Sequence, residues 1–463
     1  MLSGAWLLAC VMKIRRIKYN NHQVLGNLEL DFVNPATGLA FDTIVLIGEN
    51  GTGKTTILTT ISDYLNCVSL RPFSYIEYNA DGHQYRIEPI QNGNLCFHTR
   101  WEIGSDLQET IRRDTGNDPN TMYSDKKDLR SYASVFSKAR ADYQVNKIGS
   151  ISTKTLDSDM RERDENDNYT SLKQLIVDID NQDSKDYKNQ NRIGQVSWGA
   201  FYPTSRMHRF THAFDSFFGG KVQFDRIDTV NQDNLILFKK NGQDVPIDSL
   251  STGEKQIVYR GAYLLKNNGK MDEGAVFIDE PELSMHPSWQ RKILDYFQNL
   301  YRTPAGQMKA QIFMASHSEY LVESALKQSG QTLVVVLKEQ GGVVSAEPVT
   351  MPLLLPTVIA SEVNYAAFGI PSKDYHIALY GHIQAKYNKP RIVDCDRFIE
   401  SCVPYYDAVR HQKITRNPTG TQYNTVPTKV RNHIDHPNSA PAYNAEEMED
   451  SIKLMREILV NVP

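Results

Sequence analysis

Apolar and polar residues alternate along much of the first hundred positions of the chain. Leu28, Leu30 and Phe32 fall on every second position, which predicts a strand with one buried face. The unbroken apolar run Thr43–Ile47 predicts a second strand. The dipeptide Asp81-Gly82, between two further strand-like runs, is a hairpin signal. This part of the chain is therefore expected to be rich in strands.

The pattern changes three times further along. A polar stretch follows to about residue 195, with a helix expected near Leu129–Tyr143 and a charge-dense run at 157–167 that is typical of a solvated, mobile segment. Strand and helix patterns then alternate over 196–349, as in an α/β domain. After Pro352 the spacing becomes helical to the end, apart from one polar loop.

The last hundred residues predict a small helical bundle. Helices are expected over Ile359–Phe368, Asp374–Tyr387 and Arg391–Ser401. A last helix follows Asn444, whose side chain can cap it while Glu447 completes a capping box. This helix carries apolar residues at helical spacing, which indicates a core face: Met448, Ile452, Met455 and Leu459.

Length and charge limit the functions that the chain can have. With 463 residues it should form two or three domains, and 51 basic against 55 acidic side chains exclude a protein that coats polyanions with its whole surface. Five scattered cysteines show neither metal-ligand nor disulfide spacing and indicate buried thiols of a cytoplasmic protein. The apolar residues 1–11 lack a basic flank and are too short to span a bilayer, so we expect a dispensable overhang and no membrane contact.

The segment Gly48-Glu-Asn-Gly-Thr-Gly-Lys54-Thr55 fits the phosphate-loop pattern, and it lies between a predicted strand and a predicted amphipathic helix. Glycines let backbone N–H groups close around phosphates at a helix N-terminus. Lys54 is expected to reach the β- and γ-phosphates of ATP, and the Thr55 hydroxyl to ligate Mg²⁺. The expected nucleotide-binding residues of this loop are Gly48, Asn50, Gly51, Gly53, Lys54, Thr55 and Thr56.

A second segment, Ala275–Glu280, predicts a buried strand that ends in two carboxylates. Asp279 is expected to hold Mg²⁺, directly or through water, and Glu280 to polarise the attacking water as general base.

Two more motifs complete a set. Leu250-Ser251-Thr-Gly253-Glu-Lys-Gln256 matches the signature L-S-x-G-x-x-Q, and a predicted strand ends in Ser316-His317 at the place of a switch histidine. In this order the motifs resemble the heads of ABC-type ATPases over about residues 12–345, and most closely the RecF, SMC and overcoming-lysogenization-defect group. The resemblance implies an α/β fold and a dimer in which Ser251 and Gly253 of one chain contact the γ-phosphate bound at Lys54 of the other.

The same resemblance leaves the Q-loop glutamine open between Gln195 and Gln91. The interval between the phosphate loop and the signature contains no heptad array, so long SMC-like arms are excluded. The expected blocks are an ATPase lobe at 12–101, a polar helical insertion at 102–195, a second ATPase lobe at 196–350 and a helical domain at 356–463.

Near the end, the segment from Arg431-Asn432 to His436 resembles the R-N-x-x-x-H motif of HEPN domains, which are four-helix ribonucleases or modules derived from them. The resemblance implies that His436 handles proton transfer at a ribose hydroxyl and that Arg431 steadies the phosphate. Residues 410–436 form the most basic stretch of the chain and suit nucleic-acid phosphates. Its basic residues and histidines include Arg410, His411, Lys413, Arg416, Lys429 and His433.

These features favour a cytoplasmic ABC-type ATPase, at least dimeric, with an all-α HEPN-like C-terminal domain, in bacterial defence against phage. In one hypothesis the ATPase is a sensor and scaffold that controls a partner nuclease, as in Septu-type or PARIS-type systems. In a second, the chain is itself a ribonuclease toxin governed by ATP-dependent head pairing. A RecF-like role in DNA repair is the third.

Overall fold

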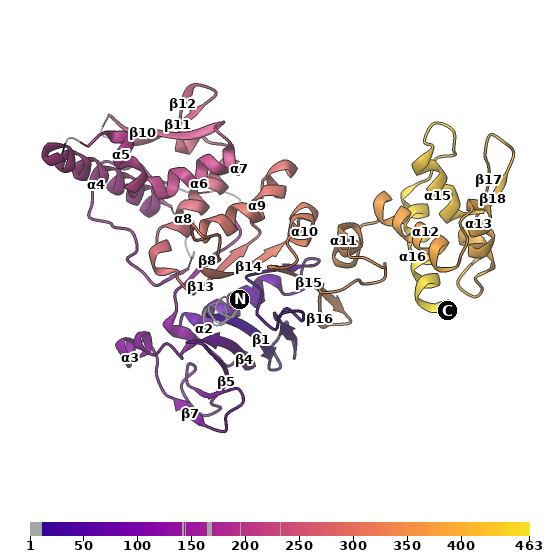
Figure 1. Cartoon of the computed structure of the whole chain (residues 1–463), viewed down its shortest axis with the longest axis horizontal. Coiled ribbons are helices and arrows are strands. Elements are labelled where there is room, and N and C mark those ends of the chain that lie inside the picture. The colour runs from indigo at the N-terminus through magenta and orange to yellow at the C-terminus, as the bar shows by residue number, and fades with distance from the viewer. Residues whose placement is uncertain (1–11, 141–142, 144, 164–168, 195, 232) are drawn as a thin grey trace. The chain divides into compact units, whose positions relative to one another are not determined.

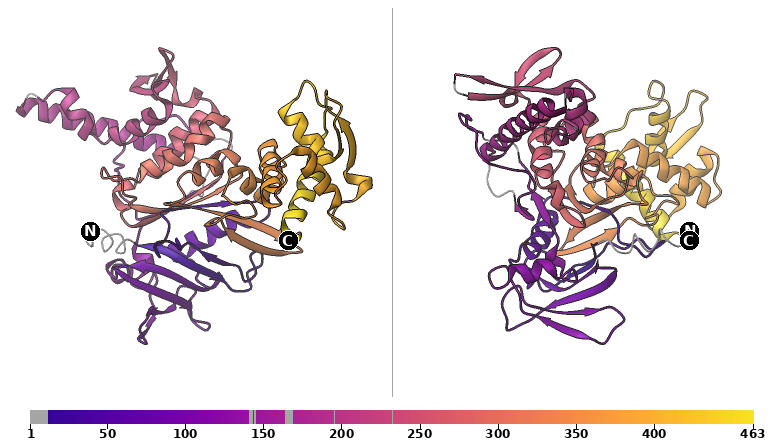
Figure 2. Two further views of the ribbon diagram at one scale, coloured as in Figure 1. Left: turned by 45° about the vertical axis from the view of Figure 1, so that its right-hand side comes forward. Right: turned by 60° about the vertical axis from the view of Figure 1, so that its left-hand side comes forward.

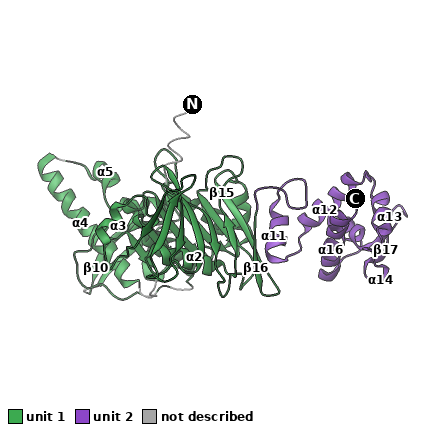
Figure 3. Ribbon diagram, turned by 90° about the horizontal axis from the view of Figure 1, so that it is seen from below, with its two compact units in different colours: residues 1–348 green, residues 349–463 purple. Residues whose placement is uncertain are grey.

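The computed structural model describes residues 12–463 except 141–142, 144, 164–168, 195 and 232. Residues 1–11, expected to be an overhang, the Q-loop candidate Gln195 and part of the charged run 157–167 thus lie outside the described residues. The chain divides into two compact units, residues 1–348 and residues 349–463 (Figure 3).

A seven-stranded sheet forms the centre of the first unit, in the order β16-β15-β3-β14-β13-β8-β9. Six of its strands are parallel, and β16 pairs antiparallel at one edge. Its strands are β3 (Thr43–Ile47), β8 (Ser134–Ser137), β9 (Arg161–Arg163), β13 (Gly274–Asp279), β14 (Ala310–Ser316), β15 (Thr332–Gln340) and β16 (Val343–Pro348). The predicted strand Thr43–Ile47 is confirmed, and the strand predicted over Ala275–Glu280 is β13, which ends one residue earlier, at Asp279.

A six-stranded antiparallel sheet lies beside it, in the order β2-β1-β4-β5-β6-β7. It consists of β1 (Lys13–Tyr19), β2 (Glu29–Asp31), β4 (Phe73–Ala80), β5 (His83–Pro89), β6 (His98–Glu102) and β7 (Gln108–Ile111). The predicted hairpin joins β4 to β5, where Asp81 and Gly82 both have positive φ, as a two-residue turn requires. Leu28, Leu30 and Phe32 are buried, as their alternation predicts.

Helix α2 (Lys54–Leu65) lies between the two sheets, as Figure 1 shows. Its apolar side chains share one core with side chains of both sheets. This core includes Ile57, Leu58, Ile61 and Leu65 of α2, Ile17 and Ile76 of the antiparallel sheet, and Ile44, Phe277 and Phe313 of the parallel sheet. The phosphate loop is therefore anchored at both ends, by a central strand and by a buried helix.

The remaining elements of the first unit include a three-stranded sheet of β10 (Val222–Val230), β11 (Asp233–Lys240) and β12 (Gln243–Pro246). The helices are α3 (Pro119–Ser124), α4 (Thr170–Gly194), α5 (Trp198–Phe201), α6 (His208–Phe218), α7 (Thr252–Lys255), α8 (Gly261–Leu265), α9 (Pro287–Leu300) and α10 (Glu319–Leu326). Figure 2 shows α4 extending from the unit.

Two expectations for the stretch 102–195 are wrong. The helix expected near Leu129–Tyr143 is a short 3-10 turn, Leu129–Ser131, followed by strand β8. Because β8 pairs with β13 and β9 pairs with β8, this stretch completes the central sheet and is not an insertion outside it. Among the described residues of this stretch, the long helix α4 and the short helix α3 have the expected helical character.

The second unit is helical, as expected, and adds a hairpin that the polar pattern around Pro418 did not reveal. Its helices are α11 (Ala360–Phe368), α12 (Lys373–Lys386), α13 (Ile392–Ser401), α14 (Ala408–His411), α15 (Val426–Asp435) and α16 (Ala445–Asn461). The hairpin pairs β17 (Gln412–Arg416) with β18 (Gln422–Thr425). The predicted capping box of Asn444 and Glu447 opens α16, and the apolar face of this helix is buried in the core of the unit.

None of the helices that the structure describes combines the length and the apolarity that a membrane-spanning segment needs.

Candidate functional site

The carboxyl ends of three neighbouring parallel strands bring the predicted catalytic segments together. Strand β14 lies between β3 and β13, with Ser316 opposite Ile47 and Ala315 opposite Asp279. The phosphate loop follows β3, the two carboxylates end β13, and His317 follows β14. One edge of the sheet therefore carries all three segments, as is usual for ligand sites of parallel sheets.

Two positions of the phosphate loop require glycine, one for close packing and one for its backbone conformation. Gly48 has a φ of 150°, and a Cβ there would overlap the backbone carbonyl oxygen of Leu337 in β15. Gly53, which caps α2, has a φ of 86° in the left-handed region. Asn50, Gly51 and Thr55 are exposed, so the outer side of the loop is open to a ligand.

Lys54 points back into its own loop. Its Nζ donates to the carbonyl oxygens of Gly48 and Glu49, at 2.8 Å each. Burial lowers the pKa of Lys54, and the nearby carboxylates of Asp279 and Glu280 oppose that shift. Nζ also donates to the Thr52 hydroxyl at 3.4 Å. These three partners are uncharged oxygens, so the positive charge of Lys54 stays available to an anion, which is the role that the motif gives it.

Thr55 and Asp279 form the predicted pair of metal ligands. The Thr55 hydroxyl lies 2.9 Å and 3.1 Å from the two carboxylate oxygens of Asp279. Burial raises the pKa of Asp279, and the hydrogen bond from Thr55 lowers it. One carboxylate and one hydroxyl fit Mg²⁺, which takes few protein ligands and completes its shell with water and phosphate oxygens.

Glu280 and His317 face each other beside this pair. Their side chains approach to 3.8 Å between Nε2 and Oε1, and each is about one-third exposed. Glu280 has a φ of 43°, a strained backbone for a residue with a side chain, of the kind that gathers at functional sites. Its N–H donates to the carbonyl of Ala315 at 2.9 Å, which ties the end of β13 to β14. Burial and the charge of Lys54 lower the pKa of His317, which favours its neutral form.

Sequence reasoning missed Glu282. This side chain is 9% exposed, and its Oε1 accepts the backbone N–H of His317 at 2.7 Å. Its Oε2 is buried with no hydrogen-bond partner, and burial raises the pKa of its carboxyl group. The only available signal was its place in Pro281-Glu-Leu-Ser-Met-His-Pro287, between the acidic strand and helix α9.

The signature residues lie elsewhere in the unit. Ser251 is exposed and caps α7, with Glu254 completing a capping box. A Cβ on Gly253 would approach the Ser284 carbonyl oxygen to 3.0 Å, so a small residue is needed where α7 packs against 281–287. In Figure 1, α7 is well separated from α2. Within one chain the structure therefore assembles Lys54, Thr55, Asp279, Glu280 and His317, but does not bring Ser251 or Gly253 to them. Gln91, the other Q-loop candidate, is exposed in the turn between β5 and β6.

A π-helical segment, Gln256–Arg260, links the signature to the acidic strand. It follows α7 directly and ends at Arg260, which is fully buried. The guanidinium of Arg260 donates to the carbonyl of Glu280 at 3.1 Å and to the carbonyl of Lys138 at 2.5 Å. Wide turns of this type occur mostly at functional sites.

A protein-family model described as "AAA domain, putative AbiEii toxin, Type IV TA system" matches residues 97–323, which include the signature, the acidic strand and His317. The chain contains an AAA-type ATPase domain. The phosphate loop precedes the matched residues, and β3 joins it to the same sheet.

Two relatives support this assignment. "Septu protein PtuA" from Bacillus thuringiensis is 24% identical over 336 residues, which is 68% of this chain and 74% of that protein. "Retron Ec83 probable ATPase" from Escherichia coli is 21% identical over 383 residues, with 65% of this chain and 69% of that protein covered.

Solved structures similar to the chain include two SMC heads. The SMC head domain from Thermotoga maritima has 15% identity and a TM-score of 0.38, and covers 73% of this chain and 99% of its own. The SmcHead bound to the C-winged helix domain of ScpA has 14% identity and a TM-score of 0.41, and covers 73% of this chain and 97% of its own.

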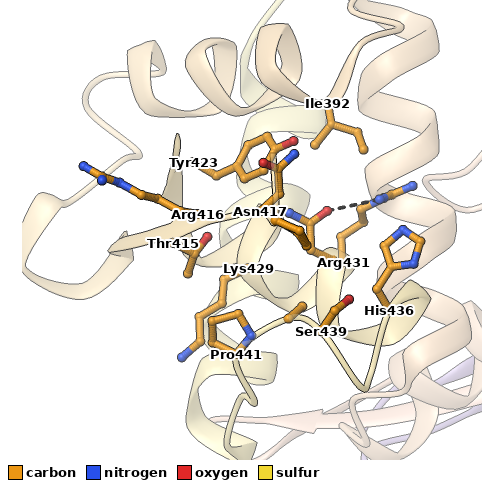
Figure 4. Close-up of a pocket in the computed structure, with 13 residues that line it drawn as sticks. Ile392, Thr415, Arg416, Asn417, Tyr423, Lys429, Arg431, His436, Ser439 and Pro441 are labelled. Carbon is orange, nitrogen blue, oxygen red and sulfur yellow. Dashed lines mark hydrogen bonds between the residues drawn. The ribbon is translucent and has the colours of Figure 1, made fainter. Parts of the chain in front are cut away.

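Outside the ATPase domain, the structure places Arg431 and His436 on one pocket of the second unit, with a cavity volume of about 380 Å³ (Figure 4). Arg431 lies on α15, and His436 ends that helix. The Arg431 guanidinium contacts Asp435 at 2.6 Å and donates to the Asn432 amide oxygen at 3.1 Å. Asp435 therefore offsets part of the positive charge of Arg431 through a direct ion pair.

The basic stretch 410–436 is largely engaged within the unit. Arg410 pairs with Asp450, and Lys429 donates to both carboxylate oxygens of Glu447, at 2.7 Å and 2.9 Å. His411 is buried. Lys413 and Arg416 are exposed, so the surface available to an anion is smaller than the composition suggests.

Proposed function

We propose that the chain hydrolyses ATP with Mg²⁺ at the end of the parallel sheet and uses the reaction to control a nuclease in defence against phage. The observation that carries the hydrolysis is the cluster of Lys54, Thr55, Asp279, Glu280 and His317 on three adjacent strand ends. Together these residues can bind the phosphates, hold Mg²⁺ and activate the attacking water, which are the tasks that phosphoryl transfer to water requires.

Each residue has a distinct task in this proposal. The loop N–H groups and Lys54 bind and orient the phosphates, and Lys54 exchanges its carbonyl partners for phosphate oxygens. Thr55 and Asp279 would hold Mg²⁺, which when bound neutralises charge on the phosphates. Glu280 orients and deprotonates the attacking water, and His317, held largely neutral, donates toward the γ-phosphate.

Two copies of the chain are proposed to complete each site. Glu280 and His317 are each about one-third exposed, so the γ-phosphate side of the cluster is open in a single chain. Ser251, exposed at the N-terminus of its turn, does not reach the cluster of its own chain, which supports its supply from a second copy. Such shared ligands would make pairing depend on ATP.

The role in defence rests on the two relatives, a Septu protein and a retron ATPase. We propose that the ATPase is a sensor and scaffold for a separate nuclease subunit. A ribonuclease activity of the chain itself is the second candidate, because Arg431 and His436 line the same pocket. RNA incubated with the wild-type chain and with His436→Ala separates the two candidates. Absence of cleavage in both would contradict the second candidate, and equal cleavage by both would contradict the role of His436 in it.

The test of hydrolysis is Glu280→Gln. Removing the base while keeping the side-chain shape should lower kcat about a hundredfold or more and leave ATP binding intact. With ATP and Mg²⁺ the variant should accumulate as a dimer in light scattering, because the shared ligand is not consumed. Adding Ser251→Arg, at an exposed position, should remove the dimer while ATP still binds.

Lys54→Ala is the matched control and should abolish ATP binding. Unchanged turnover in Glu280→Gln would overturn the assignment of the general base. A Glu280→Gln protein that binds ATP and stays monomeric would overturn head pairing.

A further inference from the structure

The pocket of the second unit is enclosed by three separate parts of the chain. The start of α13 contributes Ile392, the β17–β18 hairpin contributes Thr415–Pro418 and Tyr423, and α15 with the segment after it contributes the remaining residues. The last group consists of Lys429, Arg431, Asn432, His436, Ser439, Ala440 and Pro441. Figure 4 shows Arg416 and Lys429 on one side of the pocket and Arg431 and His436 on the other.

The charged side chains that line the pocket are all basic, which favours an anionic ligand. Arg416, Lys429 and Arg431 line the pocket, and the lining contains no Asp or Glu. Lys429 and Arg431 have acidic partners behind the wall, Glu447 and Asp435. Arg416 has no carboxylate partner among the described residues, and its hydrogen bond to the Gln422 amide oxygen is long, at 3.5 Å. The charge of Arg416 is thus free for a ligand.

Polar groups inside the pocket are also unused. The Thr415 hydroxyl oxygen is buried and has no hydrogen-bond partner, a state that costs free energy unless a ligand or water completes it. Ser439 lies on the opposite wall and is exposed.

The size and the apolar surfaces of the pocket exceed what a bare phosphate needs. A volume of about 380 Å³ falls in the range of small-ligand sites. Ile392, Pro418, Tyr423 and Pro441 provide apolar surface against which a flat ring can pack. The Asn417 amide oxygen accepts from Thr419 and Thr421, so its amide nitrogen is the part that can donate to a ring edge. An anion attached to a polar aromatic ring matches this combination.

We infer that the pocket binds a nucleoside phosphate, with the phosphate at Arg416 and the base against the apolar wall. The ligand is a free nucleotide or an unpaired nucleotide of an RNA strand, which share this chemistry. The inference goes beyond ATP hydrolysis in the first unit and does not require that Arg431 or His436 cleave the ligand.

The test is calorimetric titration of the full-length chain carrying Lys54→Ala, without Mg²⁺, so that the phosphate loop does not contribute. The probes are 5′-AMP, 5′-CMP, a single-stranded RNA pentamer and inorganic phosphate. We expect saturable binding of the nucleoside phosphates, and weaker binding at high salt. Arg416→Ala should weaken this binding at least about tenfold, as loss of one charge-assisted hydrogen bond predicts.

The matched control is Arg397→Ala. Arg397 is also exposed and belongs to the same unit, but it does not line the pocket, so its loss should leave affinity unchanged. Ser439→Trp, which fills the cavity from an exposed segment, should also abolish binding. Tighter binding of the pentamer than of the mononucleotides would assign the ligand to an RNA strand, and equal affinities to free nucleotides.

Three outcomes would overturn the inference: no binding of any nucleoside phosphate, equal loss in Arg416→Ala and Arg397→Ala, or binding of inorganic phosphate as tight as that of AMP. Since Lys54 is absent from the test, failure here says nothing about ATP hydrolysis, and loss of hydrolysis in Glu280→Gln says nothing about the pocket.

Discussion

Glu282 shows how a buried carboxyl group can serve the candidate ATPase site without touching the nucleotide. Its Oε1 fixes the backbone N–H of His317, and the histidine side chain in turn faces Glu280. Burial raises the pKa of Glu282, which favours a neutral carboxyl group at this position. We therefore regard Glu282 as a positioning residue for His317.

Two substitutions of Glu282 should distinguish its role in positioning His317 from an effect of its own charge. Gln keeps an oxygen that accepts the His317 N–H, so Glu282→Gln should keep most of the turnover. Glu282→Leu removes the acceptor and should lower kcat about tenfold, equivalent to about 1.4 kcal/mol, with little change in KM for ATP. Steady-state ATPase kinetics measure both parameters.

Glu323→Leu is the matched control, because Glu323 is a surface acid of α10 that pairs with Lys327. Equal losses of kcat in Glu282→Gln and Glu282→Leu would show that charge, not position, is the contribution of Glu282.

At the residue scale the sequence predicts which motif residues meet at the site better than it predicts the residues that position them. Lys54, Thr55 and Asp279 could be assigned because strand ends of a parallel sheet meet at one edge. The bond from Glu282 to His317 spans 35 residues and depends on how the segment after β13 folds back, which no local pattern encodes.

At the scale of elements, short buried segments were the hardest to predict. Ser134–Ser137 is a four-residue strand whose pairing with β13 decides its conformation, whereas its flanks suggested a helix. The β17–β18 hairpin was hidden by its polar composition, since only Tyr423 and Thr425 among the residues of these two strands are buried. By contrast, α16 was predicted from its cap and its apolar spacing.

The contact between α12 and α16 should make the second unit sensitive to acid. His376 is fully buried on α12, and its Nε2 lies 2.7 Å from the Ser451 hydroxyl of α16. Burial lowers the pKa of His376 to about 3. In the unfolded chain its pKa is about 6.5, so below that pH the unfolded state binds the extra proton and the folded state does not.

The second unit should therefore lose stability by about 1.4 kcal/mol per pH unit as the pH falls from about 6.5 toward 3. Hydrogen exchange of α12 and α16 peptides at about pH 7 and pH 5, corrected for intrinsic rates, measures this loss. In His376→Gln, which can still bond Ser451, this loss should become smaller. It should not vanish, because burial also lowers the pKa values of His382 and His411 in the same unit.

His98→Gln provides the comparison for His376→Gln, because His98 is a fully buried histidine of the first unit whose pKa burial lowers to about 4. It should leave the pH dependence of α12 and α16 unchanged. The same acid sensitivity in wild type and His376→Gln would contradict the role of His376.

At the scale of the whole molecule, the two candidate sites lie in different units. Every residue of the proposed ATPase cluster lies in residues 1–348, and the nucleoside-phosphate pocket lies in residues 349–463. A chain ending at residue 348 should therefore hydrolyse ATP at a rate comparable to the full chain. Circular dichroism checks that the shortened chain folds, and a folded chain without turnover would show that the second unit completes the active site.

The link from the signature to the acidic strand has a consequence for a pair of chains. Arg260 ends the helical segment that begins at the signature, and its guanidinium donates to the carbonyl of Glu280, the proposed general base of the same chain. If two copies pair as proposed, the signature of each chain contacts nucleotide held by its partner. When the signature of one chain contacts the nucleotide held by its partner, Glu280 of the first chain would shift, and Glu280 acts on the nucleotide held by the first chain. The two sites would communicate through a few covalently connected residues, and hydrolysis would be cooperative in ATP concentration.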